Sequence, residues 1–72
     1  MSRPVKRSLT LRQHRTSVTL EDEFWQAFRE IAAARGKAIN ELAAEIDEAR
    51  AMDAGLATEI RLFVLRHYRD RD

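Results

Sequence analysis

Polar and apolar side chains alternate over residues 15–20, which read Arg-Thr-Ser-Val-Thr-Leu. Because successive side chains of a β-strand point to opposite faces, Arg15, Ser17 and Thr19 would share one face of a strand. Arginine can bridge the acceptor atoms of guanine in the DNA major groove, and Ser or Thr can hydrogen-bond to a base in either direction. We therefore take Arg15, Ser17 and Thr19 as candidate base-reading residues, with an ordinary solvated strand face as the alternative.

No other set of side chains has the spacing of a chemical site. The histidines, His14 and His67, are separated by most of the chain, and each is best explained as a structural or surface residue. The acids of residues 21–23 and 47–48 suit exposed helix faces. The chain has no cysteine, no glycine-rich phosphate loop and no Cys/His metal spacing. We expect no enzyme and no catalytic residue, and neither a metal site nor a cofactor.

Positive charge is concentrated at the beginning of the chain. Residues 1–20 contain basic side chains but no Asp or Glu, so all 12 acidic residues lie in the rest of the chain. A basic end on an acidic body favours contact with a polyanion through that end, and a solvated tail is the alternative. The candidate phosphate contacts are Arg3, Lys6, Arg7 and Arg12 in this end and Lys37 farther along the chain.

Short alternating segments should position these residues. Residues 1–7 carry a proline and few apolar side chains, and we expect them to form a flexible basic arm. The apolar side chains fall on odd positions in residues 8–11 and on even positions in residues 16–20, so one regular strand cannot turn both sets inward. A bulge or turn near residues 12–14 would allow both sets of apolar side chains to point inward. We predict one short amino-terminal strand, built on the second segment.

After the strand, apolar residues recur every three or four positions, which is typical of helices. A first helix is predicted from Glu21 to Arg35, with acids in its first turn and Gly36 as its stop. A second helix should begin near residue 39 and a third should cover about residues 56–68. The predicted fold class is therefore mainly α with one short strand.

A lone strand leaves hydrogen-bonding groups unpaired at both edges. Two copies could pair their strands, which predicts an intertwined homodimer with an intermolecular antiparallel two-stranded ribbon. A chain of 72 residues without cysteine would gain core burial from such a dimer. The ribbon and two helices would span residues 8–50, and a linker and third helix would span residues 51–72. The expected dimer core consists of Val18, Leu20, Phe24, Phe28, Ile31, Leu42, Ile46, Ile60, Phe63 and Val64.

The order of strand, acidic helix start and glycine turn resembles the ribbon-helix-helix family, the superfamily of the Arc and MetJ repressors. The resemblance rests on Arg15-Thr16-Ser17-Val18-Thr19-Leu20 and on Arg35-Gly36-Lys37-Ala38-Ile39-Asn40-Glu41-Leu42. Farther along, Arg61-Leu62-Phe63-Val64-Leu65 makes the chain similar to a bacterial subgroup that has a third helix.

The resemblance implies an obligate homodimer whose paired strands enter the major groove of double-stranded DNA. It assigns base readout to the outward strand residues, which are Arg15, Ser17 and Thr19. It assigns a phosphate clamp to the start of the second helix, at Ala38, Ile39 and Asn40. Because Ala38 lacks the hydroxyl often found there, this clamp would rely on backbone amides and Asn40.

Together these features predict a dimeric sequence-specific DNA-binding protein, acting as a small bacterial transcriptional repressor. No apolar run is long enough for a membrane span or an export signal, so we expect a cytoplasmic protein with no membrane partner. The alternative is a protein-interaction module, an antitoxin-like or adaptor dimer whose apolar residues 60–65 bind a second protein. A helix-turn-helix is disfavoured, because Glu41 and Glu45 of its reading helix would face the phosphates.

Overall fold

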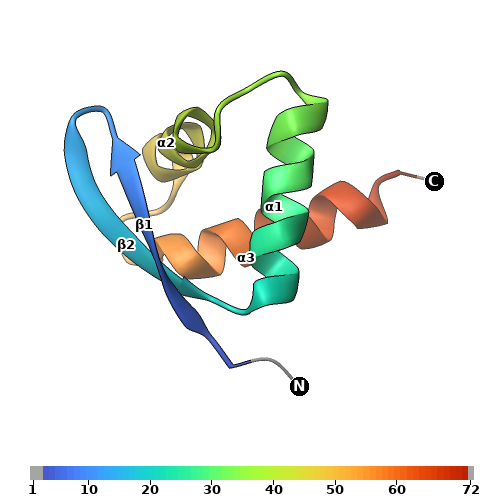
Figure 1. Ribbon diagram of the computed structural model, residues 1–72, viewed down its shortest axis with the longest axis horizontal. Coiled ribbons are helices and arrows are strands. Elements are labelled where there is room, and N and C mark those ends of the chain that lie inside the picture. The colour runs from blue at the N-terminus through green and yellow to red at the C-terminus, as the bar shows by residue number, and fades with distance from the viewer. Residues whose placement is uncertain (1–2, 72) are drawn as a thin grey trace.

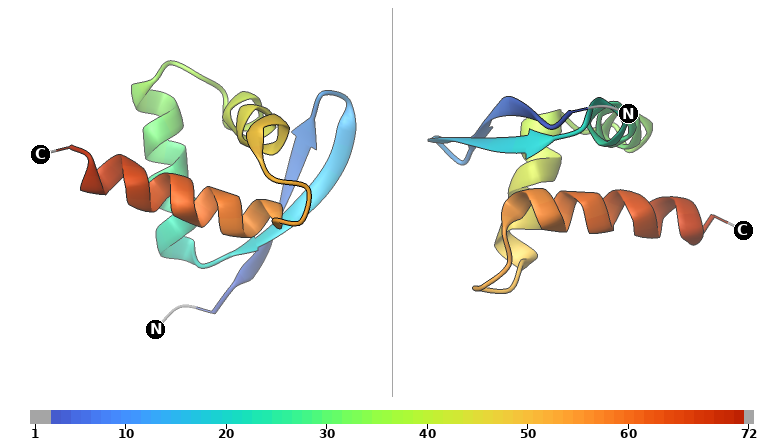
Figure 2. Two further views of the ribbon diagram at one scale, coloured as in Figure 1. Left: turned by 180° about the vertical axis from the view of Figure 1, so that it is seen from behind. Right: turned by 90° about the horizontal axis from the view of Figure 1, so that it is seen from below.

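The computed structural model describes residues 3–71, in which a β-hairpin is followed by three helices (Figure 1). The elements are β1 (Val5–Leu11), β2 (His14–Leu20), α1 (Asp22–Ala34), α2 (Ile39–Ala49) and α3 (Leu56–Arg69). Figure 2 shows the hairpin and α1 in one layer, α3 in a second layer, and α2 running from the first layer toward the second. The mainly helical fold class is confirmed, and the helices lie where the periodicity predicts them.

The two strands pair with each other inside one chain, which corrects the prediction of a single amino-terminal strand. They are joined by a turn at Arg12 and Gln13, whose φ angles of 49° and 77° are both positive. Positive φ at both central residues is typical of a type I′ turn, whose twist matches that of the flanking strands. The turn therefore lies within residues 12–14 as predicted, but it joins two strands instead of repairing one.

The register of the hairpin explains why the apolar positions change from odd to even. Leu9 stands opposite Thr16, and odd positions of β1 stand opposite even positions of β2 throughout. Directly opposite residues in an antiparallel pair point to the same face. Leu9, Leu11, Val18 and Leu20 therefore all point inward, and all four are buried.

The flexible arm predicted for residues 1–7 is corrected in its second half. Val5, Lys6 and Arg7 form the first part of β1 and pair with the last residues of β2. The local composition of this segment does not favour a strand, but cross-strand pairing satisfies its backbone groups and overrides that preference. Residues 1–2 of the arm lie outside the described residues.

Helix α1 ends in a Schellman motif. The Lys37 N–H donates to the Ala32 carbonyl at 2.9 Å, and the Gly36 N–H donates to the Ala33 carbonyl at 3.1 Å. Gly36 has a φ of 68°, a left-handed conformation that glycine adopts without the steric cost of a Cβ. The stop predicted at Gly36 is confirmed, and this turn directs the chain into α2.

The core lies between the hairpin and the three helices. Phe28 is 0% exposed, and its ring meets that of Phe63 edge-on with centroids 6.2 Å apart. Every residue expected in the dimer core is buried, or packs against the buried cluster, within a single chain. Ile60 and Val64 of α3 are among the buried ones, so much of the apolar face of α3 is used inside the chain. The buried cluster also contains residues outside the expected set, namely Leu9, Leu11, Ala32, Ala43 and Ala44.

Candidate nucleic-acid interface

The face of the hairpin opposite the core is polar along its whole length. Its cross-strand pairs are, in order, Lys6 with Thr19, Ser8 with Ser17 and Thr10 with Arg15, and all are exposed. We call these residues the outer ribbon face. It contains Arg15, Ser17 and Thr19 side by side, in the arrangement that their alternation predicts. Sequence reasoning missed Ser8 and Thr10; the available signal was the basic-x-Ser-x-Thr spacing that β1 and β2 share.

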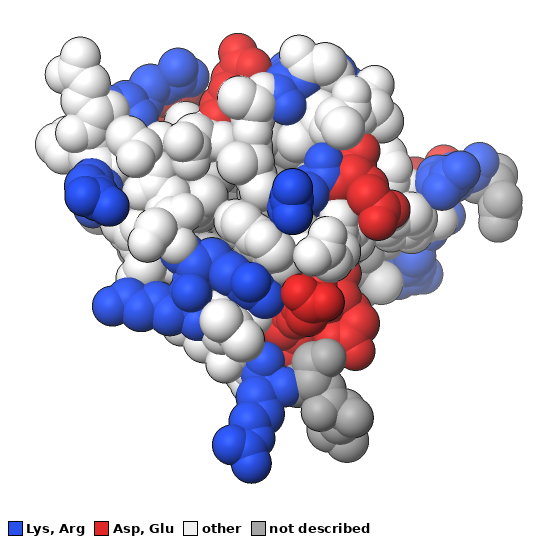
Figure 3. Space-filling view, in the orientation of Figure 1, with Lys and Arg blue, Asp and Glu red and all other residues white. Residues whose placement is uncertain are grey.

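The outer ribbon face is turned away from the helices. In Figure 2 the hairpin lies above α3, so its inner face looks toward α3 and its outer face looks toward the viewer of Figure 1. Figure 3 has that same orientation and shows Lys and Arg side chains along the hairpin, with one group of Asp and Glu near the start of α1 and others beside α2 and along α1. A polyanion approaching from this side would therefore meet positive charge over the ribbon.

Each edge of the hairpin is held by a side chain from a helix. The Oδ1 atom of Asn40 in α2 accepts a 3.0 Å hydrogen bond from the backbone N–H of Thr10. On the other edge, Nη2 of Arg61 in α3 donates a 3.0 Å bond to the carbonyl oxygen of Thr19. With a two-residue turn, the residues next to the turn form a hydrogen-bonded pair, so Thr10 and Thr19 direct their backbone groups toward the outer edges. These two contacts fix the ribbon on the helices.

Arg61 also contacts the junction between β2 and α1. Its Nε donates to Oε1 of Glu21 at 3.0 Å, and its guanidinium carbon lies 5.9 Å from the centroid of the Phe24 ring. The pKa of Glu21 is lowered, mainly by a hydrogen bond from its own backbone N–H and also by the bond from Arg61. Because α3, β2 and α1 meet at this cluster, it positions the end of the ribbon that carries Thr19.

Arg7 does not lie on the outer ribbon face, although it was a candidate phosphate contact. Its Nη2 is 3.3 Å from Oδ1 of Asp22, and its guanidinium carbon lies 5.4 Å from the centroid of the Trp25 ring. The side chain of Arg7 is only 21% exposed. It occupies an inward position of β1, because side chains alternate with a period of two. Arg7 therefore holds β1 on α1, and we no longer count it as a phosphate contact.

Two other candidate cations have carboxylate partners. Nε of Arg12 donates to Oε2 of Glu48 at 2.8 Å, and Nζ of Lys37 donates to both carboxylate oxygens of Glu45 at 2.6 and 2.7 Å. The bond between Arg12 and Glu48 lowers the pKa of Glu48 and raises that of Arg12. A phosphate would have to compete with these acids for Arg12 and Lys37, which would reduce any phosphate binding by these two residues.

The start of α2 lies against β1. Ala38 is the N-cap residue, and no side chain caps the helix. The first backbone amides of a helix have no partner inside the helix, so those at the start of α2 can bind an anion. The bond between Asn40 and Thr10 places Ala38, Ile39 and Asn40 close to the ribbon. The candidate phosphate clamp is thus near the outer ribbon face, but the side-chain oxygen of Asn40 already accepts the hydrogen bond from Thr10.

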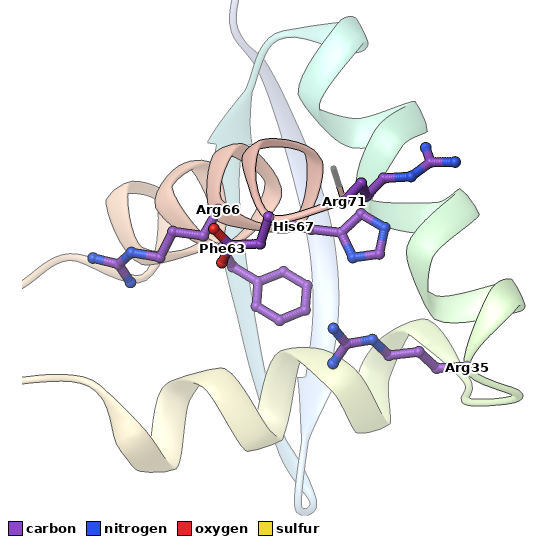
Figure 4. Close-up of a pocket in the computed structure, with 6 residues that line it drawn as sticks. Arg35, Phe63, Arg66, His67 and Arg71 are labelled. Atoms are coloured by element: carbon purple, nitrogen blue, oxygen red, sulfur yellow. The ribbon is translucent and has the colours of Figure 1, made fainter.

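A surface hollow of about 400 Å³ opens at the far end of the molecule from the hairpin turn (Figures 1 and 4). The guanidinium carbon of Arg35 lies 5.0 Å from the centroid of the Phe63 ring inside it. The hollow lies at the C-terminal ends of α1 and α3, where the helix dipole favours cations, so these charges need no bound anion to explain them. Its lining consists of Arg35, Phe63, Arg66, His67, Asp70 and Arg71.

The fold and the polar ribbon agree with the comparison to known protein families. The family described as ribbon-helix-helix domain matches residues 4–68. The chain belongs to the ribbon-helix-helix family. The resemblance read from the sequence is therefore confirmed, and the match extends from the first strand through nearly all of α3.

A solved structure of an uncharacterized protein from Bordetella pertussis Tohama I is similar to this ribbon-helix-helix chain, with a TM-score of 0.72 and 29% sequence identity. The match covers 92% of this chain and 56% of that one, so this chain spans little more than half of that protein's length. No curated protein matches the chain.

Ribbon-helix-helix proteins are, in general, DNA-binding transcription regulators that dimerise, and the family is typically non-enzymatic. Among residues 3–71, no helix has the length and apolar character that crossing a bilayer requires.

Proposed function

We propose that this ribbon-helix-helix protein is a sequence-specific DNA-binding regulator of transcription, and that its outer ribbon face enters the major groove. The observation that carries the proposal is the exposed row of Arg15, Ser17 and Thr19 on a two-stranded ribbon. The major groove is about 12 Å wide and admits a two-stranded ribbon. No acidic side chain lies on this face, so nothing on it repels the phosphates.

Base recognition and phosphate contact have separate roles in the proposed complex. Arg15 donates two hydrogen bonds to guanine, while Ser17 and Thr19 bond to neighbouring base edges. Arg3 and the first amides of α2 contact phosphates and fix the register of the protein on the duplex. Arg12 and Lys37 can also contact phosphates if Arg12 releases Glu48 and Lys37 releases Glu45. Each neutralised phosphate releases counterions, so binding should weaken steeply with added salt.

Repression is the regulatory mode that we propose, because occupying a promoter requires no activity beyond DNA binding. The proposal includes a homodimer, since members of the family generally dimerise. It places the protein in the cytoplasm of a bacterium, where the DNA is. With β1 already paired to β2, the dimer contact is no longer needed to complete the ribbon itself.

The protein-interaction alternative loses its main support in this fold. It rested on the apolar residues 60–65, yet Ile60 and Val64 are buried in the core and Phe63 packs against it. Leu65 is 49% exposed and Tyr68, one turn later on the same helix, is 39% exposed, and two exposed side chains of this kind are ordinary on a protein surface. We therefore put forward no second function.

The test is selection of duplexes from a random pool by the purified protein, followed by anisotropy titrations of the selected site at near-physiological salt. Arg15→Ala should cost about 1–3 kcal/mol on the selected site and relax the preference at one base pair. The matched control is Arg69→Ala, which removes an exposed arginine from α3, in the layer away from the ribbon. If Arg15→Ala binds the selected site as tightly as Arg69→Ala does, the ribbon does not read DNA through Arg15.

A further inference from the structure

The two strands of the hairpin carry the same pattern of side chains. β1 contains Lys6-x-Ser8-x-Thr10 and β2 contains Arg15-x-Ser17-x-Thr19, so a basic residue, a serine and a threonine recur at identical spacing. Apolar residues follow at equivalent positions in both strands, as Leu9 and Leu11 in β1 and as Val18 and Leu20 in β2. The two strands are thus a short internal repeat.

Antiparallel pairing relates the two halves of this repeat by an approximate two-fold axis. Ser8 stands directly opposite Ser17, so the axis passes between these serines. The basic residue of each strand then stands opposite the threonine of the other, as Lys6 with Thr19 and Arg15 with Thr10. The outer ribbon face is therefore nearly symmetric within one chain.

Two copies of β2 paired about Ser17 would produce the same ladder, with each Arg15 opposite a Thr19 and the serines at the centre. In this chain β1 takes the place that the second copy of β2 would occupy. We propose that one chain presents a complete reading face, and that Lys6, Ser8 and Thr10 read bases as the counterparts of Arg15, Ser17 and Thr19. This inference rests on the proposed function and assigns its specificity to both strands.

The edge contacts support a ribbon that is complete with two strands. Pairing β2 with a further strand about Ser17 would add a second donor to the outward carbonyl of Thr19, which already accepts a 3.0 Å bond from Arg61, so the two donors would share this oxygen. On β1, the outward N–H of Thr10 is occupied by Asn40 at 3.0 Å. In each repeat, the backbone of the threonine is hydrogen-bonded to a side chain from a helix. Part of each strand edge is therefore already used by a contact within the chain.

The geometry defines the kind of DNA that this face would fit. Lys6 and Thr10 are four residues apart on β1, and Thr10 is opposite Arg15, so the two basic side chains are roughly 13 Å apart along the ribbon. That length corresponds to about four base-pair steps of 3.4 Å. Lys and Arg both favour the guanine acceptors of the major groove, so the target is a short inverted repeat with one guanine in each half.

The repeat is not perfectly symmetric, and this makes the inference testable. Arginine presents a planar fork that bonds guanine at two atoms, whereas lysine presents one compact charge. The base preference should therefore be stronger in the half-site contacted by Arg15 than in the half-site contacted by Lys6. Lys6→Arg should make the base preference equally strong in the two half-sites.

The experiment repeats the duplex selection with the full chain and with Lys6→Ala, Lys6→Arg, Arg15→Ala and the control Arg69→Ala, after circular dichroism has verified their folding. Lys6→Ala should weaken the selected site roughly 5- to 150-fold and relax one half-site only, while Arg15→Ala relaxes the other half.

The inference is overturned if Lys6→Ala weakens all duplexes alike without changing base preference, because Lys6 is then a phosphate contact. It is equally overturned if Arg15→Ala relaxes the base preference in both half-sites, because the ribbon on the DNA is then made of two copies of β2. In both cases Arg15-dependent selection would leave the proposed function standing. If the wild-type chain selects no sequence at all, the proposed function itself fails, and the inference fails with it.

Discussion

The side-chain oxygen of Asn40 lies 3.0 Å from the backbone nitrogen of Thr10 and accepts its hydrogen bond. This contact joins the start of α2 to the edge of β1 across 30 positions of sequence. It gives Asn40 a structural role that precedes any contact with DNA, whereas the sequence resemblance assigns Asn40 to phosphate binding alone.

Asn40→Ala should lower the free energy of unfolding by about 0.5–1.5 kcal/mol, because it removes one hydrogen bond from a ribbon edge. Asn40→Asp is the matched control, since its carboxylate can still accept the bond from Thr10. Urea denaturation followed by circular dichroism measures both variants. A loss of DNA affinity in Asn40→Ala with unchanged stability would show that Asn40 acts on the phosphate and not on the ribbon.

Gly36→Ala should destabilise the protein by about 1 kcal/mol. Gly36 has a φ of 68°, and a Cβ added there would meet no atom within 4 Å, so the cost comes from backbone strain and not from a clash. Gly36→Asn should cost less, because asparagine tolerates the left-handed region better than alanine. Thermal melts of both variants test this order, and an alanine variant as stable as wild type would contradict it.

Phe28→Ala should unfold most of the protein at 25 °C. Phe28 is fully buried against Phe63, and a buried Phe→Ala change costs about 3–5 kcal/mol, which approaches the whole stability of a small domain. Phe24→Ala is the control, because Phe24 is only partly buried beneath Arg61 and should cost less. Near-native circular dichroism and a cooperative melt for Phe28→Ala would disprove the assigned core.

Stability should fall as the pH is lowered through the acidic range, in part because of Glu21. Its pKa in the folded protein lies below its ordinary value, so the folded state favours the ionised carboxylate. That contribution is fully present above the unfolded pKa of about 4.3 and is lost as the pH falls through the folded pKa.

Glu21→Gln should therefore flatten the dependence of the unfolding free energy on pH in the acidic range. Glu30→Gln, at an exposed position of α1, is the charge-matched control. Urea denaturation at a series of pH values provides the measurement. An unchanged slope in Glu21→Gln would mean that the cluster of Glu21 and Arg61 does not stabilise the folded state.

Much of the fold could be predicted from short stretches of sequence. The repeat of three and four positions located the helices, and Gly36 marked the end of α1. The alternation over residues 15–20 placed Arg15, Ser17 and Thr19 on one exposed face. Each of these features depends on neighbouring residues, because helix periodicity, strand alternation and the conformational freedom of glycine all act within a few positions.

The partner of β2 could not be predicted in this way. Residues 1–7 have the composition of an arm, and only the turn at Arg12 and Gln13 brings them back along β2. The same hairpin directs Arg7 inward to Asp22 and Trp25 and adds Ser8 and Thr10 to the outer ribbon face.

The sequence by itself determined the helices, the family and one half of the candidate interface. The tertiary structure alone decided that β1 pairs with β2 within the chain and that Arg7, Arg12 and Lys37 are paired with acidic side chains. The physical reason is distance along the chain: the contacts of Arg7 with Asp22, Thr10 with Asn40 and Thr19 with Arg61 join residues 15, 30 and 42 positions apart. No pattern of neighbouring residues predicts such contacts, because they form only once the strands and helices have packed together.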